Sequence, residues 1–352
     1  MQPLSNLIAE GERLMVICNA CRYCEGYCAV FPAMERRLNF SETDLNYLAN
    51  LCHNCAECYY SCQYAPPHEF SVNVPKVFAE IRARSYEKYA WPRFLRISAW
   101  WALAAGLVVA ALLAGTRSAA GADFYSVISH DAMVATFGVI TAFIVLAGVA
   151  GFLRFWRESG EGLARFFQLS TQLQGARDAL SLKNLDSNGV GCTYPDEQHS
   201  QARRRLHHFT FYGFLLCLAS TTVAAVYHSV FGWQAPYGYF SVPVVLGTLG
   251  GIGLLIGPVG FYALKLRRDP AIVDLKQDGM DISFLALLFL TSLTGLLLLV
   301  LRETAAMGPL LRIHLGVVLG LLLTLPYGKF VHSIYRLAAL VRSALEASRG
   351  QH

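Results

Sequence analysis

Eight of the ten cysteines stand in two runs that share the spacing C-x2-C-x2-C-x3-C. The first run is Cys18, Cys21, Cys24 and Cys28, and the second is Cys52, Cys55, Cys58 and Cys62. Bacterial two-cluster ferredoxins hold a pair of [4Fe-4S] clusters with cysteines at this spacing. Structural zinc sites also use thiolates, but they take four ligands in two pairs, which runs of four close cysteines fit poorly. The sequence therefore predicts two [4Fe-4S] clusters.

In such ferredoxins the fourth cysteine of each run usually binds the cluster of the other run. The first cluster is thus predicted at Cys18, Cys21, Cys24 and Cys62, and the second at Cys28, Cys52, Cys55 and Cys58. Between the runs, a Ser-x-x-Asp cap at Ser41 precedes apolar residues at helical spacing. A helix over 41–51 is expected, as in the all-helical type of two-cluster ferredoxin.

Histidines at the ends of two apolar stretches are the second set of residues that suggests redox chemistry. His207 and His208 begin one stretch, and His228 ends it. His314 begins another stretch and His332 ends it, 18 residues or five helical turns later, so one continuous helix would present both on one face. His207 and His228 are about 60° out of phase, whereas His208 and His228 lie nearly opposite. The periodicity favours His207 over His208.

Facing imidazoles at two depths of a helical bundle can hold b-type haems between them. The predicted axial pairs are His207 with His332 and His228 with His314, for one or two haems, with His208 as the alternate inner ligand and His130 as the alternate outer ligand. Single histidines also populate membrane interfaces. Ionisable residues inside a membrane are costly, however, so matched pairs at two depths favour a function.

After residue 92 the chain is dominated by apolar stretches near the ~20 residues that a bilayer crossing needs. Six spans are expected, at 95–116, 132–154, 208–231, 241–264, 282–301 and 310–331. The flanks assigned to the side of the chain ends hold 22 Lys and Arg, against three on the other side, Arg117, Arg302 and Arg312. This asymmetry predicts that both termini and the cluster domain are cytoplasmic, in a multi-pass protein of the inner membrane.

The composition agrees with a membrane protein, because 55% of the residues are hydrophobic and 15% are charged. We expect an all-α membrane protein with a cytoplasmic two-cluster ferredoxin-like domain at 1–92. A six-helix transmembrane cytochrome b-like haem domain is expected at 93–340, with a cytoplasmic loop at 155–206, and a cytoplasmic tail at 341–352. The net charge of +5 does not indicate nucleic acid as a partner, because Lys and Arg concentrate beside the spans.

Two further features predict packing roles. Cys192 and Cys217 lack the companions that a metal site needs, so both are expected to be structural thiols. Six glycines between 247 and 260 are expected to let a neighbouring helix, or a flat macrocycle, approach closely.

Three stretches of the membrane domain carry a resemblance to a known family: Arg-Leu-His-His-Phe-Thr-Phe-Tyr-Gly-Phe from Arg205, Gly-Thr-Leu-Gly-Gly-Ile-Gly-Leu-Leu-Ile-Gly-Pro from Gly247, and Leu-Pro-Tyr-Gly-Lys-Phe-Val-His from Leu325. With both cysteine runs, the chain resembles the tricarballylate or citrate utilisation protein B family over its whole length. The resemblance implies a membrane protein that reoxidises a cytoplasmic FAD-dependent dehydrogenase and passes electrons to the quinone pool. In that family the partner oxidises tricarballylate to aconitate.

No dinucleotide-binding fingerprint occurs in the soluble part of the sequence. The chain is therefore expected to be the electron-transfer subunit of an oxidoreductase and not the subunit that oxidises the organic substrate. One alternative is the same role beside another flavoprotein, such as one in corrinoid synthesis. Another is an iron-sensing or redox-sensing membrane scaffold or a transporter, although neither an inverted repeat nor a broken span with a charged midplane is apparent.

Overall fold

The computed structural model describes residues 4–93, 106 and 124–349. Within those residues the regular elements are all helical, and extended backbone pairs only at an isolated bridge between Cys192 and Ser200. The expected all-α class is therefore confirmed for the described part of the chain.

The N-terminal domain contains short helices that surround the two cysteine runs. They are α1 (Leu4–Cys21), α2 (Val30–Glu35), α3 (Glu42–Leu51), α4 (Glu57–Tyr60) and α5 (Val74–Tyr89). The helix expected over 41–51 is α3, and the Ser41 side chain accepts a hydrogen bond from the backbone N–H of Asp44 while the Asp44 carboxylate accepts one from the backbone N–H of Ser41. This capping box fixes where the chain turns between the two runs.

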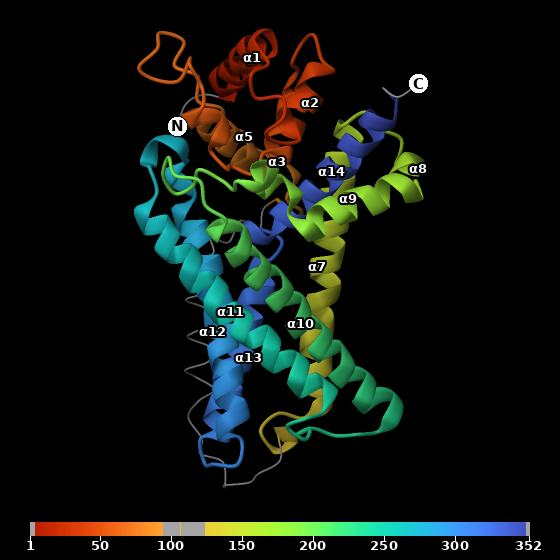
Figure 1. The fold of residues 1–352 in the computed structure, drawn as a ribbon. Coiled ribbons are helices and arrows are strands. Elements are labelled where there is room, and N and C mark those ends of the chain that lie inside the picture. The colour runs from red at the N-terminus through yellow and green to blue at the C-terminus, as the bar shows by residue number, and fades with distance from the viewer. Residues whose placement is uncertain (1–3, 94–105, 107–123, 350–352) are drawn as a thin grey trace.

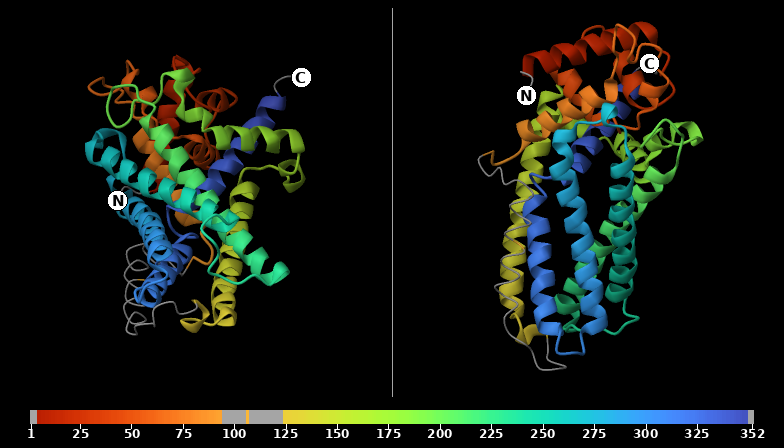
Figure 2. Two further views of the ribbon diagram at one scale, coloured as in Figure 1. Left: turned by 60° about the horizontal axis from the view of Figure 1, so that its bottom comes forward. Right: turned by 90° about the vertical axis from the view of Figure 1, so that its left-hand side faces the viewer.

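Long helices extend away from the N-terminal domain, as Figures 1 and 2 show. They are α7 (His130–Glu158), α10 (Ala202–Phe231), α11 (Val242–Arg267), α12 (Asp278–Leu301) and α13 (Met307–Thr324). In the described part of the chain, five helices, counting α12 from Leu275, are long and apolar enough to cross a membrane. They correspond to five of the six expected spans. The expected span at 95–116 lies outside the described residues.

Shorter elements connect the long helices. The segment between α7 and α10 forms α8 (Leu163–Phe166), α9 (Leu169–Ser181) and the 3-10 turns η2 (Lys183–Leu185) and η3 (Ser187–Gly189). The other 3-10 turns are η1 (Phe124–Ser126), η4 (Pro270–Ile272), η5 (Leu275–Gln277) and η6 (Lys329–Val331), and the last helix is α14 (His332–Arg349).

The prediction of one continuous helix over 310–331 is wrong. Helix α13 ends at Thr324, the backbone N–H groups of Tyr327 and Gly328 both donate to the Thr324 carbonyl, and a new helix, α14, begins at His332. Pro326 explains the break, because a proline has no N–H to donate and clashes with the preceding turn. Helix α14 then continues to Arg349, so the tail predicted from residue 341 begins inside a helix.

Helix α14 packs against α9, against α3 of the N-terminal domain and against α7 (Figure 1). A single hydrophobic core contains Leu48 of α3, Trp156 of α7 and Val341 of α14, each fully buried. An ion-pair network adds to this contact, since Arg37 binds both Asp44 and Glu346, and Glu346 also pairs with Arg342. The N-terminal domain and the helix bundle thus share one core.

Glycines let the backbones of α10 and α11 touch. A Cβ added at Gly250 would lie 2.7 Å from the carbonyl oxygen of Gly213 and 2.8 Å from the backbone nitrogen of Cys217. One added at Gly253 would lie 2.8 Å from the carbonyl oxygen of Phe209. Backbone atoms cannot swing aside, so this approach requires residues without a side chain. Helix α10 is therefore the neighbour that approaches Gly250 and Gly253 closely.

We expect Gly250→Leu to destabilise the bundle by about 1–3 kcal/mol, because the added side chain meets backbone atoms of α10. The melting temperature of the detergent-solubilised protein measures this effect. Gly138→Leu on α7 is the matched control, since a Cβ there has no atom within 4 Å in the described structure. Equal melting temperatures for the two variants would contradict the close approach.

Candidate functional site

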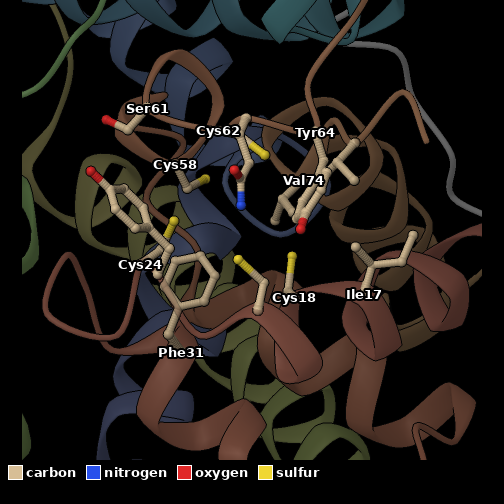
Figure 3. Close-up of a pocket in the computed structure, with 13 residues that line it drawn as sticks. Ile17, Cys18, Cys24, Phe31, Cys58, Ser61, Cys62, Tyr64 and Val74 are labelled. Carbon is tan, nitrogen blue, oxygen red and sulfur yellow. The ribbon is translucent and has the colours of Figure 1, made fainter. Parts of the chain in front are cut away.

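The first thiol set, which is Cys18, Cys21, Cys24 and Cys62, lines a cavity of the N-terminal domain together with Cys58, which is predicted for the second cluster. The cavity has a volume of about 260 Å³, and the sulfurs of Cys18, Cys24, Cys58 and Cys62 point into it, as Figure 3 shows. Cys21 also lines the cavity and is exposed to solvent. The end of α1, the turn after it and the segment from α4 to Cys62 bring these side chains together.

The electrostatics of the first set show which thiols are close enough to interact. Burial raises the pKa of Cys18 to about 12, and the negative charges of Cys24, Cys62 and Cys21 add to this effect. Burial likewise raises the pKa of Cys24 to about 12, with further contributions from Cys62 and Cys21. Cys28, which is predicted for the second cluster, also acts on Cys24, so the two sets of thiols adjoin.

The second thiol set is deeper in the protein. Cys52 and Cys55 are buried, and burial raises the pKa of Cys28 well above its usual range, with the charges of Cys55 and Cys52 as the next causes. The pKa of Cys58 is raised by burial and then by Cys55, Cys52 and Cys28. Cys24 of the first set also acts on Cys58, and Cys58 lines the cavity of the first set.

Both sets have the donor chemistry that an iron–sulfur cluster needs. Buried thiols that repel one another as thiolates lose their protons only where a cation compensates the charge, and bound metal does so. Among the described residues, no group of three or more His, Cys, Asp or Glu is placed to hold a single metal ion. The assignment of each cysteine to a cluster stays a prediction.

Cys192 adjoins the second thiol set, and this contact is not predicted from the sequence. It is fully buried, and its Sγ donates to the Leu185 carbonyl at 3.3 Å. A hydrogen bond between the two thiols raises the pKa of Cys55 and lowers the pKa of Cys192. The neighbouring Thr193 hydroxyl donates to the Cys55 carbonyl at 3.4 Å. The segment after α9 therefore covers the second thiol set, a contact for which the sequence carries no local signal.

Three arginines donate hydrogen bonds to backbone carbonyls at the end of α3 and in the loop between α3 and α4. Arg82 donates to the carbonyls of Ala49 and Cys52 at 2.9 and 2.8 Å. Arg336 of α14 also donates to the Cys52 carbonyl, at 2.7 Å. Arg203, one residue into α10, donates to the Asn54 carbonyl. The loop that carries Cys52 is thus bonded to the helices that carry the inner histidines.

The inner histidine pair is brought together as predicted from the sequence. The ring centroids of His207, in the second turn of α10, and His332, the first residue of α14, are 6.2 Å apart, with an interplanar angle of 78°. An iron ligated by both rings needs about 6 Å between centroids, for two metal–nitrogen bonds of about 2 Å and two ring radii of about 1 Å. The spacing therefore fits bis-imidazole ligation of a haem.

The hydrogen bonding of Nδ1 in each inner histidine also affects whether the pair can bind a haem iron. His332 Nδ1 donates to the Lys329 carbonyl at 2.6 Å, which leaves Nε2 as the nitrogen with a free lone pair. The Nδ1 of His207 is buried without a hydrogen-bond partner in the described structure. His208, the alternate, instead lies beside Tyr212, with ring centroids 5.6 Å apart.

The outer histidines are arranged differently from the predicted pair. His228 stacks on His130, with ring centroids 3.7 Å apart and an interplanar angle of 17°. The Nδ1 of His314 instead lies 2.9 Å from the hydroxyl of Thr294 on α12. The structure therefore brings His228 together with the alternate His130, and stacked rings at this distance leave no room for an iron between them. This arrangement does not fit bis-imidazole ligation at the outer end.

An ion network fixes the inner ends of the helices next to His332. Lys329 of η6 pairs with Asp281 at 2.8 Å, and Asp281 also pairs with Lys265 of α11 at 2.9 Å. Lys265 further binds Asp278 at 2.7 Å. The network ties η6, α11 and α12 together, so it helps to hold the backbone carbonyl of Lys329 that orients His332.

Known proteins match this chain over both of its parts. The family described as Citrate utilization protein B matches residues 93–352, and the Citrate utilization protein B Fer4-like domain matches residues 11–88. The citrate utilization protein B of Escherichia coli is 49% identical in an alignment of 357 positions that covers 97% of this chain and 93% of that protein. No solved structure matches the chain. The chain thus belongs to the citrate utilization protein B family.

Proposed function

We propose that this protein is an inner-membrane electron-transfer subunit that reoxidises a cytoplasmic FAD-dependent dehydrogenase and delivers the electrons to the quinone pool. Two [4Fe-4S] clusters and a haem b at the inner histidine pair are the proposed carriers. The dehydrogenase acts on tricarballylate or a related tricarboxylate. The observation that carries the proposal is the inner pair, 6.2 Å apart, beside a loop that bears cluster-type cysteines.

The placement of the two thiol sets supports an ordered path. Cys21 of the first set is exposed, which suits electron delivery from a docked flavoprotein. Cys52 and Cys55 of the second set are buried, and Arg336 of α14 bonds the Cys52 carbonyl one helical turn after His332. The chain thus supplies thiol ligands for the clusters, imidazole ligands for the haem, and a direct bonded link between them.

The charge distribution supports the proposed orientation. Most Lys and Arg of the membrane domain flank the ends of the helices that adjoin the N-terminal domain. By the positive-inside rule this side is the cytoplasm, where a soluble dehydrogenase and its organic acid substrate are found. The same carriers would serve another flavoprotein, so the corrinoid alternative differs in its partner alone.

The cofactor content tests the whole proposal against a transporter or a redox-sensing scaffold. The anaerobically purified protein is expected to contain eight iron atoms in clusters, since each [4Fe-4S] cluster holds four. Its reduced-minus-oxidised spectrum is expected to show b-type haem bands. A colourless protein that contains zinc would refute the proposal.

Paired substitutions distinguish a cluster ligand from a neighbouring structural thiol. Cys55→Ala is expected to remove about half of the cluster iron, because one of two clusters loses a ligand. Cys192→Ala is expected to retain all of the iron, because its S–H donates to the Leu185 backbone carbonyl. Iron and acid-labile sulfide assays check both outcomes, and loss of iron from Cys192→Ala alone would reverse the assignment.

Single substitutions test the haem ligands. His207→Leu and His332→Leu are each expected to abolish most of the haem absorbance, because either change removes one of two axial ligands. His208→Leu is the matched control on the next residue of α10, and its haem content is expected to be unchanged. Haem retained in both His207→Leu and His332→Leu would show that the inner pair does not bind it.

A further inference from the structure

The arginines around the second thiol set differ from the other buried arginines of the protein. Arg82 is buried, and Arg203 and Arg336 are partly buried. In the part of the chain that the structure describes, none of the three forms an ion pair with a carboxylate, whereas the buried Arg342 pairs with Glu346. Their guanidinium groups instead donate to the carbonyls of residues 49–54.

The three positive charges act on one another and on the second thiol set. Burial and the charge of Arg82 lower the pKa of Arg336 to about 10, with Arg203 contributing and the thiol of Cys52 opposing the shift. Arg82 and Arg336 both donate to the Cys52 carbonyl, at 2.8 and 2.7 Å. Buried charges without a counter-ion are costly. An anion that binds between these three guanidinium groups would therefore stabilise them. A [4Fe-4S] cluster with four thiolate ligands carries net negative charge and provides that anion.

The first thiol set has a different environment. Arg22 follows Cys21 directly but is exposed, so water and salt screen its charge. The two sets therefore differ in their arginines, which are buried or partly buried beside the second set and exposed at Arg22 beside the first.

We propose that Arg82, Arg203 and Arg336 make the cluster at Cys28, Cys52, Cys55 and Cys58 the one with the higher reduction potential. This inference rests on the proposed function and adds the order of the carriers. Reduction of a cluster adds one negative charge, and nearby cations favour the more negative state. The electron leaves the first cluster, which is oxidised, and enters the second, which is reduced, without transfer of a proton. Electrons are thus drawn inward from the exposed thiols to the inner histidine pair.

Redox titration of the purified protein, followed by electron paramagnetic resonance, tests the order. Arg336→Gln keeps a hydrogen-bond donor but removes the charge. At a fixed potential it is expected to lower the ratio of reduced to oxidised cluster about tenfold, which is a shift of about 59 mV for one electron, in the higher-potential cluster only. Arg336→Lys, which keeps the charge, is expected to restore most of the ratio.

Two comparisons separate this electrostatic role from a structural one. Arg342→Gln removes a buried arginine of the same helix that pairs with Glu346, and both cluster potentials are expected to stay unchanged. Arg203→Gln, which removes one bond to the loop, serves if Arg336→Gln does not fold, and it is expected to shift the same cluster in the same direction.

Three outcomes would overturn the inference. They are no shift at full iron content, a shift of the lower-potential cluster alone, or equal shifts of both clusters. Each of these leaves the proposed function intact, because both clusters and the haem are still present. Absence of clusters and haem from the unmodified protein would instead refute the proposed function itself.

Discussion

The contact between helix α14 and the loop that carries Cys52 determines how the two halves of this protein work together. His332 begins α14, and Arg336 on the next turn bonds the Cys52 carbonyl. The same helix completes the core of the N-terminal domain through Val341 and joins its ion pairs through Glu346. The distance between a cluster and a haem controls electron transfer, so this single rigid helix sets the geometry of the proposed path.

That helix exists because the chain breaks after α13. Pro326 ends helix α13, and η6 turns the chain so that His332 lies next to His207 of α10. A continuous helix would have placed His332 in line with His314 and left Arg336 away from the loop. The ion pair between Lys329 and Asp281 stabilises the turn at the point where the new direction is set.

The sequence predicts the local features of this site better than its long-range contacts. The cysteine spacing and the Ser41 cap are local, and α3 begins where the cap predicts it. The inner histidine pair also meets as expected, although the argument from a continuous helix was wrong. Pro326 and Gly328 were the available signals for the break, since such residues commonly end helices.

Other parts of the site depend on residues that are far apart in the chain. Arg82, Arg203 and Arg336 come from three helices, and sequence alone assigns each of them to the basic flanks of a membrane protein. Only the folded chain shows that they meet at one loop without carboxylate partners in its described part. Positive charge that is explained by membrane topology can therefore also act on a buried cofactor. In this protein the basic residues that flank the long helices and the arginines beside the thiols lie at the same end of those helices. The thiol sets and the inner histidines lie at that end too.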